Sequence, residues 1–445
     1  MKQIYDWAWV ESQVTQTIDV WNRSPSQWRQ VGRLYSPKEQ RQREQAYDDE
    51  LETVEYEARR APWTKAERNQ THNRLVSSFA RFSATALELE GETIKILTDE
   101  FVPVGAKLAR WARCFDADLS MADIIQACRN AWTACGLQPL LGAPMALTPS
   151  ILGYSLLYPY SDNYLDQEEI STEAKLQFSE RFRRLLQGED FFAANKQETA
   201  LHTLIGVIEG QYPRASYPHV YDCLLAIHRA QEHSIQLQTT GRSHSGDIDV
   251  LRVSCGKGGS SVLADACLAY GQLSEEESRF AFEWGVLLQL GDDLQDICED
   301  MRRGSATLFS RGAASGKPLD ELAIQLLSFS ETVGTRMDRL PNGSKVLKEL
   351  LKKSWRSLII GAVANSQHFF SAAFLSEAER YSPFRFGFLL ARQKRLVRRQ
   401  GLYAMLFEAF LEAGEGDNDG MQVPVKTHGF LRAGANPALS PIFPE

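Results

Sequence analysis

Apolar positions recur along most of the chain with the spacing of helices. Leu201, Leu204, Ile205 and Ile208 lie three and four residues apart, which is the pattern of one buried helix face. Runs of alternating β-branched residues, which mark strands, are few between residues 76 and 384. The sequence therefore predicts an all-α core.

Clusters of Gly, Pro and Ser interrupt this pattern and predict where helices end. The interruptions fall at residues 136–149, 211–218, 240–249, 312–317 and 340–344. We expect three regions: a polar N-terminal arm (1–75) with five of the nine Trp, an all-α domain (76–400), and a C-terminal extension (401–445) that ends in a partly mobile tail.

Two long uncharged stretches, residues 130–161 and 357–376, reach the ~20 residues that can cross a bilayer. The first contains four prolines, and the second carries the polar residues 365–368 at its centre. Hydrocarbon would leave those polar groups without partners. Both stretches are therefore predicted to be buried helices.

The composition of the 445-residue chain is that of a globular protein, with 43% hydrophobic and 24% charged residues. A net charge of -8 argues against a general nucleic-acid binder, because phosphate contacts need a basic surface. The seven cysteines form no C-x-x-C pair, and the first residues lack a basic-then-apolar signal pattern. We predict a cytoplasmic protein with reduced thiols.

The candidate chemistry lies in two acidic clusters. Asp162 and Asp166 are four residues apart, and so are Asp292 and Asp296, so each pair shares one helix face, with Asp293 beside the second pair. Like charges on one face repel each other, and the second cluster follows a strongly apolar stretch. Two such clusters favour a cation site over solvated helix ends.

Oxygen ligands alone select a hard ion such as Mg²⁺ or Mn²⁺, and the chain has no H-E-x-x-H zinc motif. Mg²⁺ held by few carboxylates usually completes its shell with water and substrate phosphate oxygens. The clusters therefore predict a substrate that carries a diphosphate.

Several cationic residues are candidates for binding this diphosphate. Lys257 lies in the glycine-rich run SCGKGGSS (254–261), whose glycines would let backbone N–H groups approach an anion. Neither the P-loop pattern nor G-x-G-x-x-G fits this run, so nucleotide binding has no support. The further candidates are Arg252, the pair Arg183 and Arg184, and Arg380 with Tyr381.

Three runs in this order resemble the class I isoprenoid synthases: LTPSILGYSLLYPYSDNYLD (147–166), KGGSSVLAD (257–265) and GDDLQD (291–296). The likeness covers roughly residues 100–385 and is nearest to the bacterial large terpene synthases, the tetraprenyl-β-curcumene synthase group called class IB. It implies a helical bundle around a deep apolar cavity with acidic motifs on facing helices. The sequence departs from chain-elongating synthases, since Asn163 follows Asp162 where they carry a second aspartate.

The resemblance also implies roles for individual residues. The metal ligands would be Asp162, Asp166, Asp292, Asp293 and Asp296, holding three Mg²⁺ ions, with Mn²⁺ as an alternative. Lys257 would act with Asp162, Asp166, Asp292 and Asp296 in ionising the substrate. Aromatic candidates for steering the resulting carbocation are Tyr154, Tyr158, Trp132 and Trp284.

Our first hypothesis is a terpene synthase that ionises a long prenyl diphosphate and releases a linear or cyclic terpene. The alternative is a prenyltransferase that condenses two prenyl diphosphates, either as squalene and phytoene synthases do or by chain elongation. A second alternative is a non-catalytic helical partner.

Residues 385–400 carry six basic residues and no acid, interleaved with apolar positions. On a helix this pattern makes a basic amphipathic surface. It predicts either a helix packed on the core with a solvated basic face or peripheral contact with anionic lipid, which suits a substrate that partitions into membranes.

Overall fold

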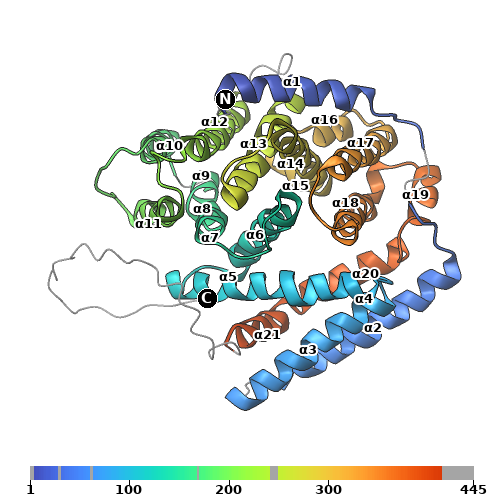
Figure 1. Cartoon of the computed structure of the whole chain (residues 1–445). Helices are drawn as coiled ribbons and strands as arrows, with labels where there is room; N and C mark the ends of the chain where they lie inside the picture. The colour runs from blue at the N-terminus through green and yellow to red at the C-terminus, as the bar shows by residue number, and fades with distance from the viewer. Residues whose placement is uncertain (1–4, 29–31, 61–63, 168–169, 241–248, 413–445) are drawn as a thin grey trace, which may run out of the picture.

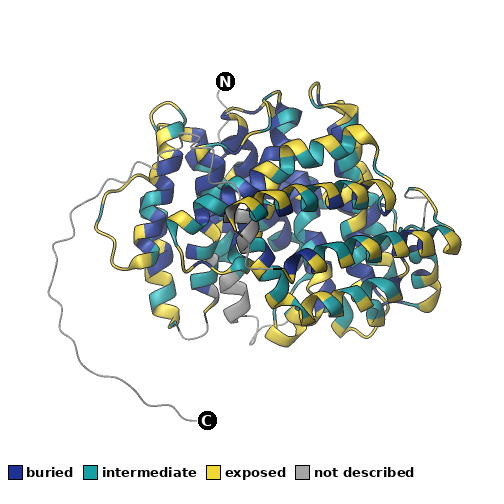
Figure 2. Ribbon diagram, turned by 90° about the horizontal axis from the view of Figure 1, so that it is seen from below, coloured by how far each residue is buried: buried dark blue, intermediate teal, exposed yellow. Residues whose placement is uncertain are grey.

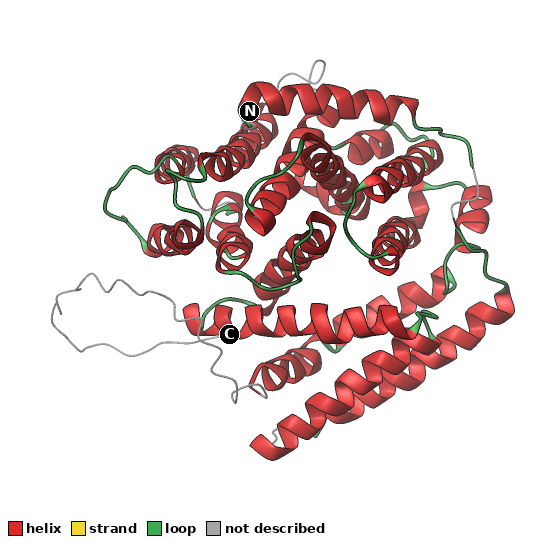
Figure 3. Ribbon diagram, in the orientation of Figure 1, coloured by secondary structure: helices red, strands yellow, loops and turns green. Residues whose placement is uncertain are grey.

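The computed structural model describes residues 5–28, 32–60, 64–167, 170–240 and 249–412. These residues form helices joined by loops, and no strand occurs among them (Figure 3). The all-α prediction is confirmed. None of the described helices combines the length and the apolarity that crossing a bilayer requires.

Helices make up most of the described residues in the first half of the chain. They are α1 (Trp7–Arg23), α2 (Pro37–Ala58), α3 (Lys65–Thr85), α4 (Gly91–Lys95), the π-helical turn η1 (Ile96–Phe101), α5 (Val102–Phe115), α6 (Met121–Leu141), α7 (Pro149–Ser155), α8 (Leu157–Tyr160), α9 (Asp162–Asp166), α10 (Thr172–Leu186) and α11 (Lys196–Gln211).

The second half contains the two central helices. Its elements are α12 (Pro218–Thr240), α13 (Val250–Tyr270), α14 (Glu275–Gln295), α15 (Ile297–Arg303), α16 (Leu308–Ala314), α17 (Asp320–Arg339), α18 (Lys345–Asn365), the 3₁₀ turn η2 (Gln367–Phe369), α19 (Ala372–Glu379), α20 (Phe386–Arg398) and α21 (Gln400–Glu412).

Most of the predicted helix ends are correct, and one is displaced. The chain breaks after Gln211, Arg339 and Ala314 as the turn residues indicate. The break expected at 136–149 starts later, because α6 continues through Pro139 to Leu141. Gly142 then ends the helix with a φ of 92°, a backbone conformation that glycine adopts without steric cost.

Helices α13 and α14 occupy the middle of the molecule, with α1, α6, α12, α17 and α18 packed around them (Figure 1). Buried residues concentrate in these inner helices, while the peripheral helices expose one face (Figure 2). α14 begins with a capping box in which Ser274 and Glu277 satisfy each other's backbone N–H groups. Seventeen apolar side chains of the two helices are buried, and their removal from water stabilises the centre of the fold.

The predicted N-terminal arm contributes to the core at its start. The Trp9 ring packs edge-on against Phe282 of α14, with 6.0 Å between ring centroids. The Tyr5 hydroxyl and the Ser278 hydroxyl are 2.7 Å apart and buried. Helix α1 therefore lies across α13 and α14, whereas α2 and α3 run side by side at the opposite edge of the molecule (Figure 1).

Candidate functional site

The site begins with an unusually close contact between α13 and α14. Gly258 and Gly285 face each other, and a Cβ built on Gly258 would lie 2.5 Å from the carbonyl oxygen of Gly285. Only glycine at both positions lets the two backbones approach this far. The contact fixes the register of the helices, so that Lys257 and Asp292 line the same cavity.

This arrangement corrects one expectation from the sequence. The glycine-rich run lies inside the continuous helix α13, so its backbone N–H groups belong to the helical hydrogen-bond ladder. Its glycines serve helix packing, with Gly259 seated against the ring of Phe282. An anion at this place would meet the Lys257 side chain and no loop of free N–H groups.

The cavity beside Lys257 has a volume of about 380 Å³. Helices α6, α7, α8, α9, α10, α12, α13 and α14 supply its walls, which are part polar and part apolar. The residues that matter for the chemistry are Arg129, Asn130, Tyr154, Tyr158, Ser179, Phe182, Leu224, Ile227, His228, Glu232, Lys257, Asp292 and Asp296. The predicted pocket tyrosines and two of the predicted metal ligands therefore share one cavity.

Asp292 and Asp296 form the acidic wall of this cavity. They stand one helical turn apart at the end of α14, and 44% of the Asp292 side chain is open to solvent. Burial by the surrounding protein raises the pKa of Asp292, and Asp296 adds to the rise while Arg129 opposes it. Burial, together with Glu299, also raises the pKa of Asp296. A cation bound beside these two carboxylates would stabilise their ionised forms.

Asp293, the third predicted ligand of this motif, points away from the cavity. Its carboxylate accepts hydrogen bonds from Ser254 Oγ at 2.7 Å and from Gln289 Nε2 at 2.8 Å. Burial raises its pKa to about 6. Asp293 therefore links α14 to α13 through its hydrogen bond with Ser254. Consecutive residues on a helix project about 100° apart, so Asp293 points in another direction than Asp292.

The first acidic motif borders the same cavity. The chain around Pro159 is broken into the short helices α8 and α9, and α9 begins at Asp162. Ser161 and Leu165, the residues that precede Asp162 and Asp166, line the cavity. The side chains of Asp162 and Asp166 lie outside the described part of the structure.

One cation of the site was missed from the sequence. Arg129 of α6 lines the cavity, and its Nη2 atom lies 3.3 Å from Asp292 Oδ1. Gln126 and Asn130 accompany it, and Asn130 Nδ2 donates to Asp265 Oδ1 at 3.1 Å. These three polar residues are spaced i, i+3 and i+4, so they share one face of α6, and this shared face was the signal that the sequence offered.

The other predicted diphosphate ligands do not line the cavity. Arg252 pairs with Glu11 of α1 at 2.8 Å, and Arg184 pairs with Glu189 at 2.6 Å. Arg380 pairs with Glu377 at 2.7 Å. Tyr381 packs beside Trp28 and accepts a hydrogen bond from its indole N–H at 3.3 Å. Each of these residues therefore contacts an acidic or aromatic partner away from the cavity.

Two of the four aromatic candidates also belong elsewhere. The Trp132 indole donates to the carbonyl oxygen of Phe101 at 2.8 Å and packs over Gly105. Trp284 is buried between Phe280 and Trp355, with ring centroids 5.6 and 5.4 Å away. Both are packing residues, whereas Tyr154 and Tyr158 remain at the cavity.

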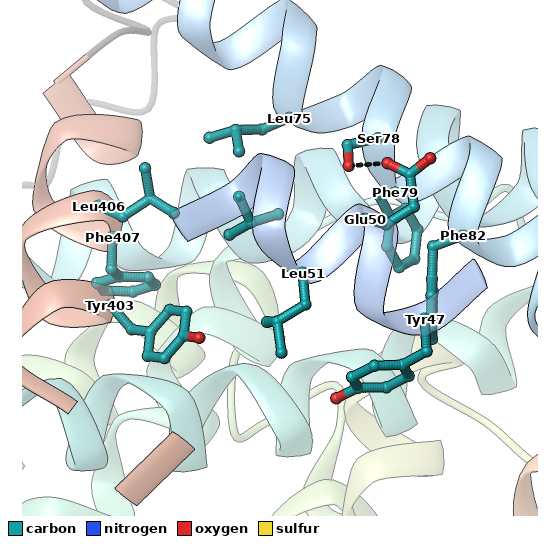
Figure 4. Close-up of a pocket in the computed structure, with 11 residues that line it drawn as sticks. Tyr47, Glu50, Leu51, Leu75, Ser78, Phe79, Phe82, Tyr403, Leu406 and Phe407 are labelled. Atoms are coloured by element: carbon teal, nitrogen blue, oxygen red, sulfur yellow. Dashed lines mark hydrogen bonds between the residues drawn. The ribbon is translucent and has the colours of Figure 1, made fainter. Parts of the chain in front are cut away.

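A second, more apolar cavity of about 410 Å³ lies between α2, α3 and α21 (Figure 4). The rings of Tyr47, Phe82, Tyr403 and Phe407 line it together with leucines, and its carboxylate, Glu50, is hydrogen-bonded to Ser78. Glu50 also pairs with Arg81. This cavity offers apolar surface but no group of unpaired charges, so the candidate chemistry belongs to the first cavity.

The basic residues of 385–400 mostly face α2. Arg385 pairs with Glu44, Arg392 with Asp48, and both Arg395 and Arg399 with the buried Glu55. Lys394 and Arg398 stay exposed. The basic face is thus largely used to hold α20 against α2, and peripheral lipid contact remains a prediction with less charge to support it.

This pairing leads to a measurable expectation. Binding to vesicles that contain anionic lipid should be weak at low salt and lost at physiological salt, because two exposed cations contribute about 1 kcal/mol each near such a surface. Co-sedimentation at the two salt concentrations tests this. A K394E/R398E variant that sediments as well as the unaltered protein would rule out this surface as the contact.

Mg²⁺ fits the donors at the first cavity, because Asp292 and Asp296 offer carboxylate oxygens one helical turn apart, and burial raises the pKa of both groups, so a bound cation would stabilise their ionised forms. Among the side chains that the structure describes, no group of three or more His, Cys, Asp or Glu converges as a metal site. No protein-family model and no curated protein matches the sequence.

Proposed function

We propose that the protein is a metal-dependent class I terpene synthase that ionises one prenyl diphosphate and releases a linear or cyclic terpene and diphosphate. The observation that carries the proposal is the convergence of Asp292, Asp296, Lys257 and Arg129 on a cavity that Tyr154 also lines. Acids for a metal, cations for an anion and an aromatic face are the three components that this chemistry needs.

The residues of the site divide the reaction between them. Asp292 and Asp296, with Asp162 and Asp166 of the first motif, would hold Mg²⁺, which neutralises charge that develops on the leaving diphosphate. Lys257 and Arg129 would bind the same group through their side chains. The allylic C–O bond breaks, its electron pair leaves with the diphosphate, and the carbocation remains in the cavity. The ring faces of Tyr154 and Tyr158 would attract the positive charge.

The supply of cations favours a single-substrate reaction over condensation. A condensing enzyme must bind two diphosphates, and so needs a second set of cationic groups. Among the described residues at the cavity, the lysine and arginine side chains are Lys257 and Arg129, while Arg252, Arg184 and Arg380 are paired with acids elsewhere. These two cationic side chains are enough to bind one diphosphate group.

Incubation of the protein with Mg²⁺ and prenyl diphosphates of ten to thirty-five carbons tests the proposal. We expect inorganic diphosphate and a terpene with the carbon number of its substrate, no effect of NADPH, and loss of turnover in EDTA. A product with the summed carbon count of two substrates would favour the prenyltransferase. No diphosphate release from any member of the series would favour the non-catalytic partner.

A further inference from the structure

A polar cluster lies on a different wall of the cavity from the acidic motif. Ser179 of α10 and His228 and Glu232 of α12 line this wall. The Ser179 hydroxyl donates to Glu232 Oε1 at 2.7 Å, and His228 Nε2 lies 3.5 Å from the same oxygen. The apolar side chains of Phe182, Leu224 and Ile227 line the cavity with them.

The geometry excludes a nucleophilic triad, although the residue types would allow one. His228 Nε2 lies 3.1 Å from the carbonyl oxygen of Ser179. A carbonyl oxygen only accepts, so Nε2 carries the hydrogen and cannot take the proton of the Ser179 hydroxyl, which is 3.4 Å from the same nitrogen. In a triad the carboxylate would meet the other ring nitrogen. Here the Ser179 hydroxyl donates to Glu232 Oε1, and the Nε2–H of His228 is shared between the Ser179 carbonyl oxygen and the same carboxylate oxygen.

Glu232 is therefore a carboxylate that lines the cavity on other helices than the acidic motif and takes no part in a nucleophilic triad. Of the three carboxylates that line the cavity in the described part of the chain, the other two are Asp292 and Asp296. The hydrogen bond from His228 and that from Ser179 lower the pKa of Glu232 to about 2, against the burial that opposes them. It stays ionised at neutral pH with 30% of its side chain exposed.

We propose that Glu232 is the base that ends the reaction by removing a proton from the carbocation. This inference rests on the proposed function. A C–H bond next to the cationic carbon breaks, its electron pair forms the new C=C bond, and the proton passes to a carboxylate oxygen of Glu232. Water then takes the proton from Glu232 after the product leaves, which restores the carboxylate.

The position of Glu232 suits this step in two respects. Both of its described contacts are made by Oε1, which leaves Oε2 as the oxygen that would accept the proton. The hydrogen bonds on Oε1 also draw off electron density, which makes the carboxylate a poorer nucleophile toward the cation. Deprotonating a carbocation needs little basicity, since the lost proton neutralises the positive charge. A carboxylate with a low pKa is sufficient.

The test is Glu232→Gln, which keeps the shape of the side chain and an oxygen that accepts from Ser179. Release of diphosphate is measured in parallel with the ratio of olefin to alcohol in the product. We expect diphosphate release within about threefold of the unaltered protein, because the residue acts after ionisation. The ratio should fall on the order of a hundredfold, as water captures the cation in place of proton loss.

Two further variants make the result unambiguous. Glu209→Gln on α11 is the matched control, since Glu209 is exposed and outside the cavity, and it should leave the ratio unchanged. Glu232→Asp keeps the charge but withdraws it by one methylene, and should give an intermediate ratio. An unchanged ratio in both Glu232 variants, or an unaltered protein that makes alcohol alone, overturns the assignment.

The same measurements separate this inference from the function on which it rests. If the unaltered protein releases no diphosphate from any prenyl diphosphate, the terpene synthase proposal fails at the first assay. If it releases diphosphate and forms olefin, but Glu232→Gln forms the same olefin in the same proportion, only the base is misassigned. The diphosphate itself would then be the group that takes the proton.

Discussion

Alanine in place of Asp296 should reduce diphosphate release by on the order of a thousandfold, about 4 kcal/mol in activation free energy. The acidic wall would keep Asp292 alone, and one carboxylate of α14 cannot hold a metal in the geometry that two provide. The rate of diphosphate release in saturating Mg²⁺ measures the effect, with circular dichroism to show that the helices persist.

The fold should tolerate this change or improve slightly. Asp296 raises the pKa of Asp292, so the two charges repel each other in the metal-free protein. Removing one relieves on the order of 0.5 kcal/mol, and a small rise in melting temperature is expected without Mg²⁺. Glu299→Ala is the control, because Glu299 belongs to the same acidic cluster but pairs with Arg303 at 2.6 Å. Full activity in Asp296→Ala would contradict the metal site.

Alanine in place of Gly285 should destabilise the protein by about 3 kcal/mol or more. The new Cβ would overlap the carbonyl group of Gly258, lying 2.7 Å from its carbon and 3.1 Å from Gly259 Cα. These atoms belong to the backbone of α13, so a side-chain rotation cannot relieve the overlap and the helices must separate. Lys257 would then move away from Asp292, and turnover should fall with stability.

Equilibrium unfolding in urea, followed by circular dichroism, measures this loss. Gly206→Ala on α11 is a matched control, since a Cβ there meets nothing within 4 Å. That variant should gain roughly 0.5 to 1 kcal/mol, because alanine restricts the unfolded chain and favours the helix. A Gly285→Ala protein with an unchanged unfolding midpoint would show that the helix contact is looser than described.

The helices and the acidic motif could be predicted because both are local properties of the sequence. The three- and four-residue spacing of apolar positions gave the all-α core, and the same spacing placed Asp292 and Asp296 on one face. Each of these inferences needs only the residues of one helix.

The partners of the charged residues could not be predicted in this way. Arg252 and Arg380 were expected at the diphosphate, but acids brought close by folding or by one helical turn hold them elsewhere. Which acid an arginine meets depends on helix packing across hundreds of residues, as with Glu55 and Arg395. Arg129 and Glu232 were missed for a different reason, since neither belongs to an acidic cluster or a known motif and it is the folded chain that brings them to the cavity.

Because of the close contact between Gly258 and Gly285, the helices that line the cavity differ in how well they tolerate substitution. Substitutions on α13 and α14 would disturb the register that places Lys257 beside Asp292. Leu157, Leu224 and Ile227 lie on other helices, and their side chains can be enlarged or shortened without touching that contact. On the proposed function, variation in product size, whether in natural homologues or in designed libraries, should therefore concentrate on these positions.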